Sequence, residues 1–111
     1  MEHEKSIMDA IQSLTLVQRT AVFRPKPTQT TSALGTQVIF VTNELIHGIA
    51  SHWAYPETVQ REIDQWRHEI AKLAARMPHK DQHEFKQALE QANGKLAAFS
   101  SLAGRERIPA H

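Results

Sequence analysis

A chain of 111 residues has the length of a single domain with a modest hydrophobic core. Thirteen Lys and Arg residues against twelve Asp and Glu residues give a net charge of +1, which disfavours a protein that binds nucleic acid by neutralising phosphates. The sequence contains no cysteine, which excludes a disulfide framework and a thiolate metal site.

The N-terminal segment is predicted to be an amphipathic helix over residues 6–23. Ser6 followed by Asp9 has the spacing of an N-cap residue and an acid three positions on. The segment lacks the basic start and apolar stretch of a signal peptide, and no part of the chain approaches the roughly 20 apolar residues of a membrane span. We therefore expect a cytoplasmic protein. The apolar residues of the predicted helix share one face: Ile7, Ala10, Ile11, Leu14, Val17 and Ala21.

Residues 24–31 are predicted to form a mobile loop. They include two prolines and four hydroxyl or amide side chains but no large apolar residue. We expect this loop to act as a hinge between the first helix and the rest of the chain.

Residues 32–54 are strongly apolar, and their secondary structure is ambiguous. The β-branched residues within 37–42 favour a strand, but no second strand elsewhere in the sequence is available to pair with it. We predict a helix that begins after Thr31 or Ser32 and ends between His52 and Tyr55. Its helically spaced apolar residues are Leu34, Val38, Val41, Leu45 and Ile49.

The same helix carries more apolar side chains than one buried face needs. Residues 38–41 are all apolar, and at about 100° per residue they cover most of the helix circumference. The helix is therefore either enclosed within the fold or presents one stripe to another protein chain. We favour the second interpretation. The predicted partner-binding residues are Val38, Ile39, Phe40, Leu45, Ile46, Ile49 and Trp53.

Residues 56–104 are predicted to form an antiparallel helical hairpin. Pro56 marks the start of its first helix and Pro78 follows its end, Asp81 with Glu84 resembles a capping box, and Gly104 is the expected end of the second helix. Residues 105–111 are expected to be a tail. Two apolar series in this hairpin step by four and three residues, the period of helices that pack together: Val59, Ile63, Trp66, Ile70, Leu73 and Met77, then Phe85, Leu89, Ala92, Leu96, Phe99 and Ala103.

Seven histidines raise the possibility of a metal site. His79 with His83 and Asp64 with His68 have the i, i+4 spacing that places two ligands on one helix face, although His79 is expected in the turn before the second helix. We interpret these histidines as solvent-facing. The chain has no His-Glu-x-x-His motif, no Gly-rich phosphate loop and no nucleophile motif, so we expect neither a metal, a cofactor nor an enzymatic activity.

The C-terminal half is similar to small all-helical quorum-sensing antiactivators of the TraM and QslA type. The similarity rests on Leu73-Ala-Ala-Arg-Met-Pro78, a short turn, and the segment from Leu96-Ala-Ala-Phe-Ser-Ser-Leu-Ala-Gly104 to Ile108-Pro109. It covers residues 56–109, includes no diagnostic motif and assigns no binding residue. The resemblance implies a protein that binds a LuxR-type transcription factor and stops it from acting on DNA.

These patterns together predict an all-α fold, with the long-helix hairpin and two further N-terminal helices in a single domain that dimerises. The expected function is that of a protein-binding regulator, an antiactivator that sequesters a LuxR-type quorum-sensing transcription factor and blocks its dimerisation and DNA binding. Two alternatives stay open, a small helical DNA-binding transcriptional regulator and a secretion or phage accessory protein.

Overall fold

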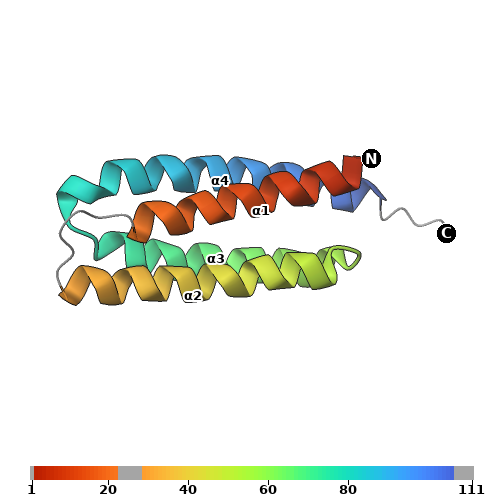
Figure 1. The fold of residues 1–111 in the computed structure, drawn as a ribbon. Coiled ribbons are helices and arrows are strands. Elements are labelled where there is room, and N and C mark those ends of the chain that lie inside the picture. Colours follow the sequence, from red (N-terminus) through yellow and green to blue (C-terminus); the bar gives the residue numbers. More distant parts are fainter. Residues whose placement is uncertain (1, 23–28, 107–111) are drawn as a thin grey trace.

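The chain folds into an antiparallel four-helix bundle (Figure 1). The computed structural model describes residues 2–22 and 29–106. Within these ranges the helices are α1 (Glu2–Val22), α2 (Gln29–His52), α3 (Pro56–Ala75) and α4 (His79–Glu106), and there is no strand. The predicted all-α fold is therefore confirmed, and residues 37–42 are helical.

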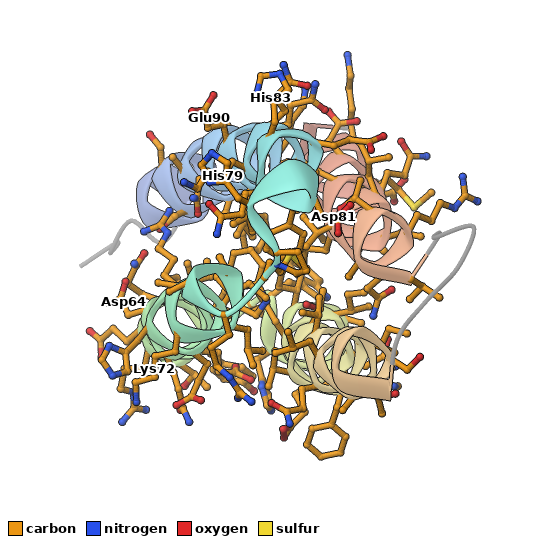
Figure 2. The ribbon with its side chains drawn as sticks, turned by 90° about the vertical axis from the view of Figure 1, so that its left-hand side faces the viewer. Asp64, Lys72, His79, Asp81, His83 and Glu90 are labelled. Carbon is orange, nitrogen blue, oxygen red and sulfur yellow. The ribbon has the colours of Figure 1, made fainter. Side chains whose placement is uncertain are left out.

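Each helix has two neighbours and one side that faces away from the bundle. α1 and α3 both pack against α2 and α4, whereas α1 lies diagonally across from α3, and α2 lies diagonally across from α4 (Figure 2). In the described ranges, α3 and α4 form the least extensive of the four contacts and α1 with α4 the most extensive. The two N-terminal helices thus supply much of the packing that the hairpin of residues 56–104 lacks by itself.

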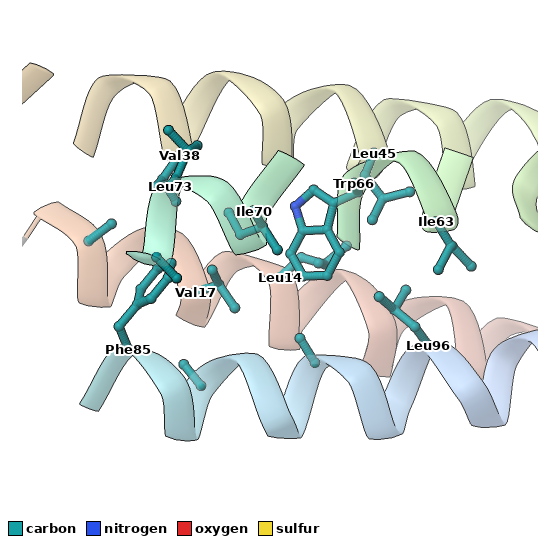
Figure 3. Close-up of a cluster of buried hydrophobic side chains, with 14 of the residues drawn as sticks. Leu14, Val17, Val38, Leu45, Ile63, Trp66, Ile70, Leu73, Phe85 and Leu96 are labelled. Atoms are coloured by element: carbon teal, nitrogen blue, oxygen red, sulfur yellow. The ribbon is translucent and has the colours of Figure 1, made fainter. Parts of the chain in front are cut away.

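All four helices contribute to one hydrophobic core (Figure 3). The six residues of the first predicted series, from Val59 to Met77, are all buried. In the second series Leu89 is half-buried, and the side chain of Ala103 lies outside the described residues. The other core residues are Phe85, Ala92, Leu96 and Phe99 of that series, Ala10, Leu14, Val17 and Ala21 of α1, Leu34, Val38, Leu45 and Ile49 of α2, Ala74 of α3 and Ala88 of α4.

Predicted helix starts were wrong in three places. α1 begins at Glu2, so Ser6 and Asp9 lie inside the helix and not at its N-terminal cap. Glu4 in the first turn favours the earlier start, because a negative charge interacts favourably with the exposed N–H groups at a helix N-terminus. α2 begins at Gln29, within the predicted loop, whose remaining residues 24–28 lie outside the described ranges. α4 begins at His79, because the Asp81 N–H already donates to the Pro78 carbonyl at 2.9 Å.

Predicted helix ends agree better with the structure. α2 ends at His52 and α3 ends at Ala75, before Pro78, as expected. The prediction for Gly104 was wrong, because α4 continues to Glu106 and no described glycine has a positive φ. A glycine closes a helix only when it adopts the left-handed conformation, so Gly104 is an ordinary helical residue here.

A hydrogen bond between α3 and α2 determines how α2 is rotated about its axis. Trp66 is 3% exposed, and its indole Nε1 donates to Oγ1 of the fully buried Thr42 at 3.1 Å. A buried N–H without an acceptor costs about 1–3 kcal/mol, so this bond favours the rotation that turns Thr42 inward. Phe40 is two residues earlier, about 200° around the helix, and therefore points outward.

The opposite flank of α2 is held against α1. A methyl group on Gly35 would lie 3.0 Å from the carbonyl oxygen of Ala21, so glycine permits a close approach of the two backbones. The Gln18 side-chain amide donates to the Ile39 carbonyl at 3.1 Å and to Asn43 Oδ1 at 2.7 Å. α2 is thus fixed by polar contacts from both neighbouring helices.

We expect Trp66→Ala to lower the free energy of unfolding by about 3–5 kcal/mol, because it removes a buried aromatic side chain. Thr42→Val should lower it by about 1–3 kcal/mol, because the indole N–H then has no acceptor. Urea denaturation followed by circular dichroism measures both values. Thr36→Val is the control, since the hydroxyl of Thr36 is exposed. An equal effect at Thr36 and Thr42 would contradict the role of the buried bond.

A pair of glycine substitutions tests the close approach of α2 to α1. Gly94→Ala should raise the free energy of unfolding by about 0.5–1 kcal/mol, because no atom other than those of the local helix backbone lies within 4 Å of the added methyl group and alanine favours a helix. Gly35→Ala should lower it, because the methyl group meets a backbone oxygen that cannot move away easily. Thermal unfolding of the two variants gives the comparison, and equal gains would contradict it.

Candidate protein-binding surface

The structure places three of the seven predicted partner-binding residues in the core. Val38, Leu45 and Ile49 are at most 2% exposed. Their assignment to a partner surface was wrong, because they form the inner face of α2 and pack within the same molecule. Sequence periodicity alone had given this helix two candidate faces, and these residues belong to the inward one.

The other four predicted residues lie wholly or partly at the surface. Phe40 is 64% exposed and Trp53 is 41% exposed. Ile39 and Ile46 are half-buried, and Ile46 packs against the edge of the core. Their role in partner binding stays a prediction, now centred on Phe40.

α2 carries far less charge than its neighbour α3. Glu44 is the only acidic or basic residue in α2 apart from its histidines. Exposed faces of helices in globular proteins are usually charged, which makes the outer face of α2 unusual in this molecule. By contrast, α3 is shorter and carries Glu57, Arg61, Glu62, Asp64, Arg67, Glu69 and Lys72.

The exposed face of α2 has a regular pattern. Its residues step by three and four along the helix, the spacing at which side chains of one helix interlock with those of another. Phe40 is the one large apolar side chain of this pattern, with small or uncharged polar residues on both sides. We call this face the α2 seam, and it consists of Ala33, Thr36, Phe40, Asn43, His47 and Ala50, all exposed.

Of the six residues in the α2 seam, only Phe40 was predicted from the sequence. The prediction followed apolar character, whereas the other five side chains are small or polar. The signal that was present in the sequence is the run of uncharged residues at a 3.5-residue spacing. That signal becomes meaningful only when Thr42 is known to point inward.

A shallow cleft lies beside the seam, between α2 and α3. Glu62 rests against Gly48, where any side chain on α2 would clash with it, and its Oε1 lies 3.0 Å from His52 Nδ1. The absence of a side chain at Gly48 therefore allows a carboxylate to lie over α2. Three glutamates make the cleft acidic, and its lining residues are Val41, Glu44, Leu45, Glu62, Gln65, Trp66 and Glu69.

The histidine pairs considered as metal ligands are exposed. His79 lies inside α4, not in the preceding turn as expected, so His79 and His83 do share a helical i, i+4 spacing (Figure 2). Asp64 accepts from Gln60 Nε2 at 2.9 Å and lies 3.8 Å from Arg67 Nη1. The described residues include no group of three or more His, Cys, Asp or Glu that could hold a metal ion.

Comparisons with known proteins identify no family for this chain. No family model matches it, and no curated protein or solved structure is significantly similar to it. None of the described helices is long and apolar enough to cross a membrane. Only the geometry of the described residues therefore supports the candidate surface.

The division of α2 into an inner and an outer face is testable by stability. Phe40→Ala should change the free energy of unfolding by no more than about 0.5 kcal/mol, because the ring is mostly exposed. Val38→Ala should lower it by about 2 kcal/mol, because it removes buried methyl groups. Urea denaturation gives both values. A larger loss at Phe40 than at Val38 would mean that the inner and outer faces are exchanged.

Proposed function

We propose that this chain is a protein-binding regulator and that its target contacts the α2 seam. The observation that carries the proposal is the exposure of Phe40 at the middle of a helix face almost without charge. Centres of protein interfaces are depleted in charged residues and enriched in aromatic ones. An exposed aromatic side chain in such a setting is a typical anchor for a partner.

The surroundings of Phe40 fit the anatomy of an interface. Ala33, Thr36 and Ala50 are short enough to let the backbone of a target helix approach the seam. The acidic cleft borders the seam on the side of α3, where basic residues of a target can pair with Glu44 or Glu69. The target therefore presents an apolar surface with a pocket for the phenyl ring and basic residues at one edge.

We also propose the more specific role of an antiactivator. The target is then a LuxR-type quorum-sensing transcription factor, which the chain meets in the cytoplasm and whose dimerisation surface it covers, so that the factor no longer binds DNA. This identity rests on the resemblance of residues 56–109 to the TraM and QslA type of antiactivator. The net charge of +1 is compatible with it, because covering a protein surface requires no neutralisation of phosphates.

A promoter-release assay tests this function. The purified chain is titrated into a LuxR-type factor from the same genome, bound to its promoter, and the complex is followed by electrophoretic mobility shift. We expect the wild-type chain to release the DNA. Phe40→Ala should require about 30-fold more protein, as for an aromatic anchor worth about 2 kcal/mol.

Tyr55→Ala is the matched control, because Tyr55 is also 64% exposed but lies in the turn after α2. It should release the promoter as the wild-type chain does. Failure of the wild-type chain to release DNA would overturn the antiactivator role. Direct binding of the chain to DNA, with an affinity that falls steeply with salt, would support the alternative of a DNA-binding regulator.

A further inference from the structure

We infer that a second copy of this chain covers the α2 seam when no target is present, with the two α2 helices antiparallel about a two-fold axis level with residues 41 and 42. The inference rests on the proposed function and adds a regulatory step to it. The same Phe40 cannot enter a target and a second copy at once, so self-association and capture of the target compete.

The α2 seam is complementary to itself in one antiparallel register. In that register Phe40 lies opposite the partner's Asn43, Thr36 opposite the partner's His47, and Ala33 opposite the partner's Ala50. A single register thus pairs every residue of the seam, and each large phenyl ring faces a smaller side chain. A surface that matches its own copy in this way is the requirement for a symmetric dimer.

The same register brings opposite charges together. Glu62 lies against Gly48, and α3 runs antiparallel to α2, so Lys72, ten positions after Glu62, lies level with residue 38. In the antiparallel pair, the partner's Glu44 lies level with residue 39. Each dimer therefore contains two Glu44–Lys72 pairs related by the two-fold axis.

Both groups are placed to make this contact. Glu44 lines the cleft on the α3 side of the seam, and Lys72 is exposed on the side of α3 turned away from α4 (Figure 2). Within the part of the chain that the structure describes, neither side chain forms a hydrogen bond or an ion pair. Glu44 is also the only formal charge of α2, so the register creates no repulsion between the paired helices.

Sedimentation equilibrium of the purified chain, without any target, tests the inference. We expect twice the 12.6 kDa mass of one chain at micromolar concentrations, and the monomer mass for Phe40→Asp. Glu44→Lys and Lys72→Glu should each raise the dissociation constant of the dimer about tenfold, because each turns two attractive pairs into repulsive ones. The double variant Glu44→Lys with Lys72→Glu should return it to near the wild-type value.

Glu90→Lys is the control, because Glu90 is exposed on α4, away from α2 (Figure 2). It should leave the dissociation constant unchanged, and circular dichroism confirms that all variants stay helical. A monomeric wild-type chain, a dimer that survives Phe40→Asp, or a double reversal that fails to restore association would each overturn the inference. No target is present, so these outcomes concern self-association alone, whereas promoter release decides the proposed function separately.

Discussion

The hydrogen bond from Trp66 to Thr42 determines which face of α2 the molecule shows to its surroundings. It holds one side of the helix against α3, while the amide of Gln18 holds the other side against α1. Between these two contacts α2 has no freedom to rotate. The aliphatic residues of its inner face are enclosed, and Phe40 is left outside. The unusual surface of this protein is thus a consequence of a polar pair in its core.

The core could be predicted from the sequence because its apolar residues recur at a regular spacing. The series from Val59 to Met77 has a spacing that only a packed helix explains, and every member is buried. The prediction of a helix for residues 37–42 was correct, and it rested on the lack of any second strand in the sequence that could pair with this segment. Helix boundaries were less predictable. A capping group contributes only about 1 kcal/mol, which the continuation of a good helix can outweigh, as at Ser6 and Gly104.

The surface could not be predicted in the same way. Consecutive apolar residues at 38–41 cover nearly all directions around the helix axis, so hydrophobicity does not say which of them face inward. Which residues of α2 face inward depends on Thr42, a polar residue whose burial no apolar pattern indicates. Val38 and Phe40 were both predicted to bind a partner. They differ in the structure because one is on the side of Thr42 and the other is opposite.

α1, α3 and α4 meet solvent with several charged side chains each, whereas Glu44 is the only acidic or basic residue of α2 apart from its histidines. Each described helix packs against only two others, so none of the described helices covers the outer face of α2. α2 therefore separates the stability of the fold from the recognition of a partner, two properties that often conflict in small proteins. The residues that stabilise the fold lie on one side of α2, and those available for recognition lie on the other, so recognition can change without loss of the core.

The positions of the two tryptophans give the molecule two intrinsic fluorophores with different surroundings. Trp66 is 3% exposed at the centre of the bundle, whereas Trp53 is 41% exposed directly after α2. Emission from the enclosed indole follows the integrity of the core. Emission from the accessible one, and its quenching by acrylamide, follows whatever approaches that end of the helix. Folding and association can therefore be observed separately by light, without a dye attached to the chain.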